Sequence, residues 1–317
     1  MIIDSHMHVG FRGFSADRIV EYLDRNGIDA CWLLTWEEVD PAVPQDYLHL
    51  SIEDVFEAYQ KCPDRILPMY APDPSRPDAP ERLRHWQRQG VRGCGELKVS
   101  LNWDSEKLDG LLRCVGELNV PLAFHMENHR ACYASDSGSA ADRLFARLLS
   151  TERLHGIPRA VAERAAKACP PLGARRERLR RWFPGYLLDF DGLERRLEAY
   201  PEVRFVGHGP LFWAGISEDV QPGAQYPKGE VGREGITCRL LVEHDNLYAD
   251  VSGTSGFNAI TRDRPFTKRF LPRFEEKILF GTDNFRLGQK EYLDSLGLSK
   301  RTYQRIYYEN AMGLTGR

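Results

Sequence analysis

Side chains that bind divalent metals stand where several short apolar runs of this sequence end. An imidazole nitrogen and a carboxylate oxygen are ligands that zinc and similar ions take in proteins. His6 and His8 are two positions apart in an extended stretch, so their side chains project to the same side. A catalytic ion keeps a position for water, whose pKa it lowers to about 7, so the expected chemistry is hydrolysis. The candidate ligands are His6 and His8 after the first run, His125 after the fifth, His208 after the sixth and Asp283 after the eighth.

Each of these residues also has an ordinary explanation when it is taken alone. A pair of histidines can lie in many polar pockets, and a buried histidine such as His125 is usually satisfied by neighbouring groups. His208 could bond to a loop, and Asp283 could cap the helix that follows it. Separate coincidences at four strand ends explain the set poorly, and we therefore expect these residues to form one metal centre.

The apolar runs alternate with stretches of helical periodicity. This alternation predicts repeated βα units and a parallel sheet, so the predicted fold class is α/β. Eight runs indicate a (β/α)8 TIM barrel, in which the carboxyl ends of all strands, and with them the active site, lie on one face. The predicted strands are Ile2–Asp4, Ala30–Thr35, Ile66–Tyr70, Gly93–Val99, Pro121–His125, Arg204–Gly207, Leu247–Val251 and Ile278–Gly281.

The chain of 317 residues fits a single barrel domain, residues 1–317, that carries insertions. The connection over residues 128–200 follows the fifth strand and is too long for one loop, so we expect a helical insertion after strand 5. Its basic run Arg175–Arg181 is predicted to be a solvated helix face. Residues 209–231 are rich in glycine, proline and aromatic side chains. Because both segments follow barrel strands, we expect them to act as lids.

The composition argues against several other classes of protein. Hydrophobic residues make up 42% of the chain and charged residues 28%, which is typical of a globular protein. A net charge of −3 argues against nucleic-acid binding, and no apolar run approaches the roughly 20 residues that span a membrane. The sequence has no signal-peptide pattern, and its seven scattered cysteines do not form a disulfide framework. We therefore expect a cytoplasmic protein.

Five motifs of the sequence can be compared with those of known families: Ile3-Asp-Ser-His6-Met-His8, Val206-Gly-His208-Gly, Asp250-Val-Ser252-Gly, Leu279-Phe-Gly-Thr-Asp283 and Tyr308-Glu-Asn310-Ala. They resemble the motifs of the amidohydrolase superfamily, and specifically its amidohydrolase-2 branch, which includes aminocarboxymuconate-semialdehyde decarboxylase-like proteins. The resemblance covers nearly the whole barrel, and it implies that His6, His8, His125 and Asp283 bind the metal. By the same resemblance, His208 is either a ligand or the residue that polarises the substrate.

The fourth strand leaves the number of ions open. Gly95-Glu96 resembles the Gly-Glu pair of TatD-like nucleases, and Glu96 as a ligand would support two ions, with His125 and His208 on the second. The alternative is that Glu96 pairs with Lys98 or with an arginine inside the barrel mouth. The expected cofactor is one or two divalent ions, zinc first and manganese second.

The predicted activity is hydrolysis of a small amide, lactone or ester. Asp283 would act as general base and acid, and His208, if it is not a ligand, would stabilise the oxyanion. The alternative is non-oxidative decarboxylation of an aromatic or unsaturated acid. The expected partner is a small-molecule substrate, and we expect binding neither to nucleic acid nor to a membrane. A homodimer is expected because dimers are the commonest oligomers of soluble proteins. The candidate substrate contacts are Lys98, Trp103, Trp213, Asn258 and Arg262.

Overall fold

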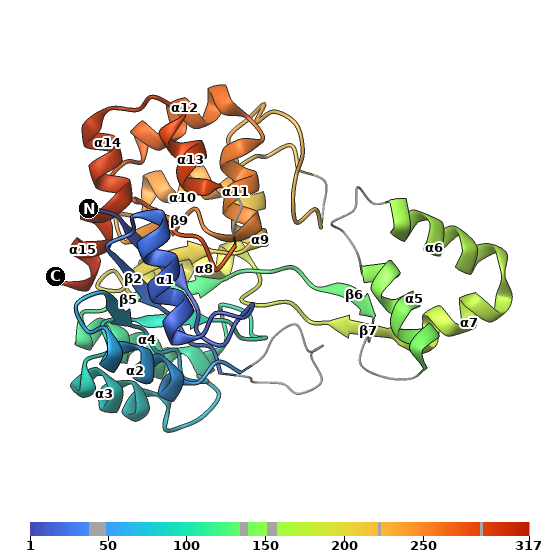
Figure 1. Ribbon diagram of the computed structural model, residues 1–317, viewed down its shortest axis with the longest axis horizontal. Helices are drawn as coiled ribbons and strands as arrows, with labels where there is room; N and C mark the ends of the chain where they lie inside the picture. Colours follow the sequence, from blue (N-terminus) through green and yellow to red (C-terminus); the bar gives the residue numbers. More distant parts are fainter. Residues whose placement is uncertain (38–48, 134–138, 151–156, 221–222, 286–287, 317) are drawn as a thin grey trace. The chain divides into compact units, whose positions relative to one another are not determined.

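The structure is a computed structural model that describes residues 1–37, 49–133, 139–150, 157–220, 223–285 and 288–316 (Figure 1). The chain divides into two compact units. The first comprises Met1–Val39, His49–Asn128 and Tyr186–Arg317. The described part of the second lies within His129–Gly185, which we call the helical insert. None of the described helices is long and apolar enough to cross a membrane.

The first unit is a (β/α)8 barrel, as predicted. Its described strands form one parallel group in the order β1-β2-β3 and another in the order β10-β9-β8-β5-β4. Backbone hydrogen bonds join the groups at both edges, from Tyr70 N to Gly93 O (3.0 Å) and from Ser5 N to Phe280 O (2.9 Å). The strands are β1 Ile3–Met7, β2 Ala30–Leu33, β3 Ile66–Pro68, β4 Cys94–Leu97, β5 Pro121–His125, β8 Arg204–His208, β9 Leu247–Asp250 and β10 Ile278–Leu279, and they match the eight predicted runs.

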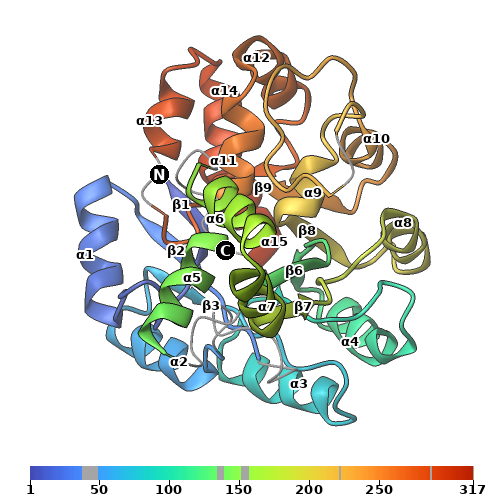
Figure 2. The ribbon, with the colours of Figure 1, turned by 90° about the vertical axis from the view of Figure 1, so that its right-hand side faces the viewer.

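Helices surround these strands as a ring (Figure 2). The first helix begins where Ser15 Oγ accepts a hydrogen bond from Arg18 N, and it ends at Gly27, whose φ of 61° suits glycine. The main helices are α1 Ala16–Asn26, α2 Ile52–Lys61, α3 Ala79–Gln89, α4 Asp109–Leu118, α8 Phe190–Ala199, α10 Ile236–Glu243, α12 Arg264–Arg273 and α14 Lys300–Gln304. The other described helices of this unit are Glu106–Leu108, α9 Pro210–Ala214, α11 Gly253–Thr261, α13 Gln289–Asp294, Arg305–Glu309 and α15 Asn310–Thr315.

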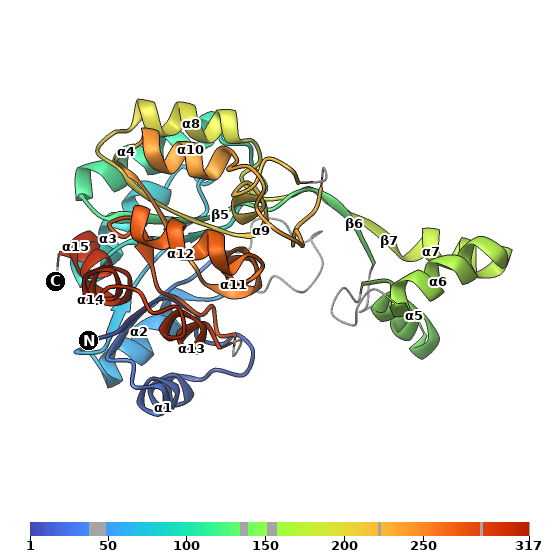
Figure 3. The same ribbon diagram turned by 90° about the horizontal axis from the view of Figure 1, so that it is seen from above.

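The helical insert has a small core of its own. Its strands β6 (Arg130–Tyr133) and β7 (Arg180–Phe183) are antiparallel and lead into the three helices (Figure 3). Those helices are α5 (Ala140–Ser150), α6 (Ile157–Ala168) and α7 (Pro170–Leu179). A helical insertion after strand 5 was predicted, whereas the β6–β7 ribbon was not. The action of this insertion and of residues 209–231 as lids stays a prediction. The core of the insert consists of Tyr133, Phe145, Ala146, Leu149, Ala162, Ala166 and Leu179.

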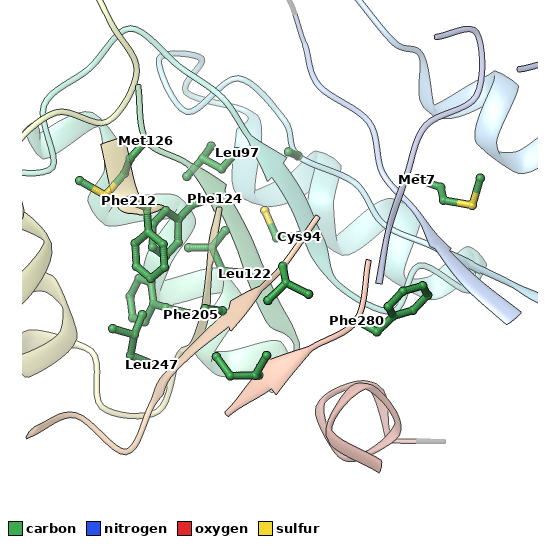
Figure 4. Packing of buried hydrophobic residues seen from close by; sticks show 14 of the residues in the cluster. Met7, Cys94, Leu97, Leu122, Phe124, Met126, Phe205, Phe212, Leu247 and Phe280 are labelled. Atoms are coloured by element: carbon green, nitrogen blue, oxygen red, sulfur yellow. The ribbon is translucent and has the colours of Figure 1, made fainter. Parts of the chain in front are cut away.

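Successive side chains of each strand point alternately outward and inward, and this gives the barrel two hydrophobic layers. Phe124 and Phe205 pack outward with Phe212, between strands and helices (Figure 4). Their neighbours Ala123 and Val206 belong to a second cluster, formed mainly by strand residues, that fills the interior. Because side chains alternate between the two faces of a strand, the next interior positions after Ala123 and Val206 are His125 and His208. The hydrophobic pattern of β5 and β8 therefore directs both histidines into the barrel.

Candidate metal centre

The predicted ligands come together at the carboxyl ends of the barrel strands. His6 lies in β1 and His8 directly follows it, while His125 and His208 are the last residues of β5 and β8. Asp283 lies in the turn after β10, with a φ of 54°. The histidine side chains are at most 9% exposed, and that of Asp283 is 16% exposed. The carboxylate of Asp283 is therefore the most accessible of these groups.

The donor atoms have the spacing that a shared ion requires. His8 Nε2 lies 3.4 Å from Asp283 Oδ1, and His6 Nε2 lies 3.8 Å from Glu96 Oε1. His208 Nε2 is 4.0 Å both from Glu96 Oε1 and from Asp283 Oδ2. Ligands about 2.1 Å from a tetrahedral ion lie about 3.4 Å apart, so a small contraction would bring these atoms into coordination.

Three of these buried groups have a donor or acceptor atom without a hydrogen-bond partner. Within the described part of the chain, His6 Nε2, His8 Nε2 and Glu96 Oε2 have none. A buried polar atom that stays unsatisfied costs about 1–3 kcal/mol, so atoms of this kind that face one another indicate a missing partner. Imidazole nitrogens beside carboxylate oxygens fit a divalent cation as that partner.

Asp250 orients two of the histidines. Its Oδ2 accepts a hydrogen bond from His6 Nδ1 at 3.1 Å, and its Oδ1 accepts one from His208 Nδ1 at 3.0 Å. Ser252 Oγ also donates to Asp250. His8 Nδ1 donates in the same way to a backbone oxygen, that of Leu34, at 2.9 Å. Since each Nδ1 donates its proton, each neutral ring presents a lone pair at Nε2, toward the centre.

His125 lies in the centre, but both of its ring nitrogens are engaged. Nδ1 is 2.6 Å from Glu96 Oε1, and Nε2 is 3.2 Å from Glu127 Oε2. Gln225 Nε2 donates to the other oxygen of Glu127 at 3.4 Å. Ligand atoms of Glu96, His125 and His208 lie within 4.8 Å of one another, so they form a second possible group of ligands. His125 would have to exchange one carboxylate for an ion to bind it.

The electrostatics of the centre favour positive charge. Burial alone would raise the pKa of Asp250, but His208 and His6 outweigh it and hold the pKa far below its usual range. Burial lowers the pKa of His6, yet Asp250, Glu96 and Asp283 together raise it to about 9. Four carboxylates, those of Glu96, Glu127, Asp250 and Asp283, thus surround the histidines, and Lys98 Nζ approaches Glu96 Oε2 at 3.8 Å. A divalent cation would balance this excess of buried negative charge.

The predicted substrate contacts separate into different surroundings. Lys98 is at the centre, with Nζ 4.1 Å from the ring centre of Trp36 and 5.9 Å from that of Tyr186. Trp103 is fully buried in the hydrophobic core, where it packs edge-on against Phe124. Trp213 is also buried, and its Nε1 donates to Asp250 O at 2.9 Å. The structure therefore gives both tryptophans a packing role and does not bring them to the mouth of the site.

Asn258 and Arg262 lie on or after α11. Asn258 Nδ2 donates to Pro227 O at 3.0 Å. The guanidinium of Arg262 is half-buried, burial lowers its pKa, and its Nε and Nη2 find no partner in the described ranges. Among the described residues, no hydrogen bond or ion pair joins either side chain to the histidines. A cavity of about 730 Å³ lies elsewhere, between α1 and the start of α13, and none of the candidate ligands lines it.

The sequence did not reveal how three residues act on the ligands. Asp250 enters the sequence analysis only as part of a motif, although an aspartate at the carboxyl end of a barrel strand by itself indicates a residue of the active site. Glu127 follows His125 by two positions, which places both on the same side of an extended segment. Asn284 follows Asp283 and bonds to the backbone of His8. A strand-end reading extended by two residues would have found Glu127.

Comparison with known proteins points to one family. The family model described as amidohydrolase matches residues 3–314. No curated protein matches this chain.

Solved structures with the same barrel include enzymes of different names. A probable 2-pyrone-4,6-dicarboxylic acid hydrolase of Acinetobacter baumannii, with citric acid bound, is 14% identical, with 100% of this chain and 99% of that chain covered and a TM-score of 0.53. A 2,6-dihydroxybenzoate decarboxylase from Rhizobium is 16% identical, with 99% of this chain and 98% of that chain covered and a TM-score of 0.54. A 5-carboxyvanillate decarboxylase of Novosphingobium aromaticivorans was solved in complex with manganese and 4-hydroxy-3-methoxy-5-nitrobenzoic acid. It is 16% identical, with 96% of this chain and 82% of that chain covered and a TM-score of 0.53. At these identities the likeness establishes the barrel fold alone.

Proposed function

This chain belongs to the amidohydrolase family, and we propose that it is a metal-dependent hydrolase that cleaves a small amide, lactone or ester. The observation that carries this proposal is the convergence of His6 Nε2, His8 Nε2 and Glu96 Oε2, buried and without hydrogen-bond partners among the described residues, beside Asp283. A divalent ion held by these groups would polarise a carbonyl group and lower the pKa of a water molecule.

His6, His8 and Asp283 form the primary ligand set in this proposal, and Glu96 and His208 complete it. The hydrogen bond from His208 Nδ1 to Asp250 supports the ligand role for His208. With that proton on Nδ1, neutral His208 presents a lone pair at Nε2 and has no proton there to donate to an oxyanion. Burial also lowers the pKa of His208, which favours the neutral ring. His125 would belong to a second ion, bridged by Glu96, or would stay bonded to Glu96 and Glu127.

Asp283 is the proposed general base and acid. Its side chain is more exposed than the histidines, and its two oxygens face different neighbours, since Oδ1 lies near His8 and Oδ2 near His208. One oxygen can stay beside the ligand cluster while the other takes a proton from the attacking water and passes it to the leaving group. Lys98 would hold an anionic group of the substrate.

Decarboxylation of an aromatic or unsaturated acid is the second candidate. The specific observation in its favour is Lys98, a buried cation beside Trp36 and Tyr186 and next to the proposed ligand cluster. A cation over aromatic rings can hold a carboxylate while a planar ring stacks nearby. Two of the structurally similar proteins are decarboxylases by name, and one of these was solved with manganese, so manganese stands beside zinc as the proposed ion.

Elemental analysis of the metal content tests the proposal. We expect one or two equivalents of zinc or manganese in the unaltered protein, and a loss of at least one in His8→Ala. The group Glu194, Glu243 and His244 offers a matched control, because its donor atoms are equally close but Glu194 already binds Arg239. His244→Ala should therefore keep all of the metal. A protein that contains no metal and takes up neither zinc nor manganese would contradict the proposal.

Assays of Lys98→Met separate the two activities. For hydrolysis of an uncharged lactone or ester, the variant should keep its kcat/KM, because no carboxylate has to be held. For release of carbon dioxide from an aromatic acid, it should lose at least about tenfold in kcat/KM, because a buried ion pair with substrate is lost. Substrate panels of both kinds, run on the metal-loaded protein, decide which of these results applies.

A further inference from the structure

The cavity of about 730 Å³ lies within the barrel unit, apart from the candidate metal centre. It is lined by α1, the loop before α1, the turn after β10 and the start of α13, and α1 and α13 are neighbours in the ring of helices (Figure 2). Among the described residues that line it, none is a candidate metal ligand or a predicted substrate contact. Its volume lies within the range of about 300–1,000 Å³ that is typical of pockets for small molecules.

Four aromatic side chains line the cavity. Phe14 and Phe280 are buried, and Phe280 belongs to the outer hydrophobic layer (Figure 4). Tyr22 packs edge-on against Phe14, with 5.5 Å between the ring centres, and Phe285 adds a fourth ring. Aromatic rings offer large apolar faces and edges to a flat molecule, so this lining favours a ligand with an aromatic body.

Basic side chains outnumber acidic ones among the charged residues that line the cavity. Four are basic and two are acidic, a surplus of +2 in a chain whose net charge is −3. A pocket with a positive surplus attracts an anionic ligand. The charged residues described in its lining are Arg12, Arg18, Arg25, Lys290, Glu21 and Glu291.

Two of these cations are already paired with carboxylates. Arg25 Nη2 lies 3.5 Å from Glu21 Oε2, and Lys290 Nζ lies 2.7 Å from Asp294 Oδ2. Each carboxylate offsets the charge of its partner, which weakens the attraction of that cation for a ligand. Recognition of an anion in this cavity therefore falls mainly to the other basic residues.

Arg18 differs from these two cations because its partner is uncharged. Its Nη1 donates to Gly13 O at 2.8 Å, and no ion pair joins it to a carboxylate in the part of the chain that the structure describes. The bond to Gly13 fixes one nitrogen, and Nε and Nη2 share the other edge of the guanidinium, which matches the two oxygens of a carboxylate. Arg12 brings a second guanidinium against the aromatic lining, 4.0 Å from the ring centre of Phe285.

Glu291 limits the charge that a ligand can carry. Its carboxylate also lines the cavity, and it makes no ion pair with any residue of the described ranges. A phosphate group carries up to about two negative charges at neutral pH, whereas a carboxylate carries one. Because like charges repel, Glu291 disfavours a phosphate more than it disfavours a monocarboxylate.

We propose that this cavity is a second binding site of the protein and that it takes an aromatic monocarboxylate. The carboxylate pairs with the guanidinium of Arg18, and the ring packs among the aromatic side chains of the lining. The proposal does not depend on the activity of the metal centre. The two sites are nevertheless neighbours in the chain, since Thr282 lines the cavity and directly precedes Asp283, so binding at each has to be measured separately.

Isothermal titration calorimetry with 2-naphthylacetate tests the proposal on the full chain, as purified and after addition of zinc. We expect Arg18→Met to weaken binding about 10- to 100-fold, because a charge-assisted pair is lost. Naphthylethanol, which lacks the carboxylate, and acetate, which lacks the rings, should bind about tenfold more weakly than the probe, or worse. Arg113→Met is the matched control, because Arg113 is an exposed arginine of α4 outside the cavity lining, and it should bind the probe normally.

Hydrogen exchange locates the bound probe. Protection should appear in α1 and at the start of α13, and Lys98→Met, which alters the metal centre, should keep both this protection and the binding that depends on Arg18. If the chain takes up no metal but keeps that binding, the proposed hydrolase fails and the cavity site stands.

Four results would overturn the proposal. Binding that is lost in Lys98→Met but kept in Arg18→Met would place the probe at the metal centre. Equal affinity for naphthylethanol would show that the charge is not recognised. Displacement of the probe by inorganic phosphate would show that charge alone is recognised. The absence of binding up to about 10 mM probe would leave the cavity without this ligand.

Discussion

Asn284 holds the backbone of His8 from both sides: its Oδ1 accepts from His8 N at 2.7 Å, and its Nδ2 donates to His8 O at 2.8 Å. Asn284 directly follows Asp283, so one residue fixes the distance between two proposed ligands that lie 275 positions apart in the chain. Asn284 is 3% exposed, which protects both bonds from water.

Asn284→Ala should therefore weaken both the fold and the metal site. It leaves two buried backbone groups of His8 unsatisfied, at a cost of about 2–4 kcal/mol in the free energy of unfolding. The affinity for zinc should fall about 10- to 100-fold, as is typical when a group that supports a ligand is lost. Urea unfolding and a competition titration with a chelator measure the two effects. Unchanged zinc affinity in a folded variant would argue against His8 and Asp283 as joint ligands.

Asp250→Asn should disturb the centre without changing its shape. An amide has one oxygen and one NH₂ group, so it can accept from only one of the two imidazoles and would donate to the other. That second ring must then carry its proton on Nε2, which blocks its lone pair. We expect a 10- to 100-fold loss of zinc affinity. Ser252→Ala removes one hydrogen bond to Asp250 but keeps the carboxylate that accepts from both imidazoles, so its effect on zinc affinity should be smaller.

Glu37 makes part of the stability depend on pH. Burial would raise the pKa of Glu37, but hydrogen bonds from Arg82, Asp73 N and Tyr70 outweigh it and lower the pKa below 4.5. Because the folded-state pKa is the lower one, the stabilisation is complete above the unfolded value near 4.5 and is lost as the pH falls through the folded value.

Urea unfolding of the unaltered protein and of Glu37→Gln, repeated from pH 7 down to about pH 3, checks this dependence. At pH 7 the variant should be less stable by about 1–3 kcal/mol, since a carboxylate bonded to an arginine is replaced by a neutral amide. The difference should shrink below pH 4.5. A difference that stays constant over the whole range would show that the charge of Glu37 is not what stabilises the fold.

Gly207→Ala should disrupt the strand that carries His208. A Cβ at this position would lie 2.4 Å from Phe212 Cε2 and Cζ, so the backbone of β8 or the ring of Phe212 must move. We expect a loss of about 1–3 kcal/mol in stability, together with weaker metal binding. Gly313→Ala is the control, because nothing lies within 4 Å of its Cβ and alanine favours the helix by about 0.5–1 kcal/mol. Thermal unfolding measures both variants.

The sequence allowed the barrel to be predicted because its signal is repeated. Eight apolar runs, each followed by a helix, specify parallel strands, and parallel strands place their carboxyl ends together. His6, His8, His125, His208 and Asp283 could therefore be assigned to one centre without any knowledge of distances. The short strands β6 and β7 have one buried residue each and carry no apolar run, so the same reasoning did not find them.

Side-chain direction after a strand was harder to predict. Trp103 and Trp213 follow strand ends, as substrate-binding residues of barrels do, but the turn that holds Trp103 and the helix α9 that holds Trp213 place both rings in the core. The partners of His125 could not be predicted either, because Glu96 and Glu127 approach its two ring nitrogens only in the folded protein. Asp250 bonds to two histidines from different strands, a relationship that no local pattern encodes.

The pairing of Ser5 with Phe280, separated by 275 positions, sets an order of events during synthesis. While the ribosome makes the chain, β1 emerges first and has no neighbour on one side until β10 arrives. During that interval the edge of β1 stays exposed to aggregation, and His6 and His8 have no Asp283. An ion bound before β10 folds would be held by an incomplete set of ligands. Folding of β10 and assembly of the proposed metal centre are thus a single late step.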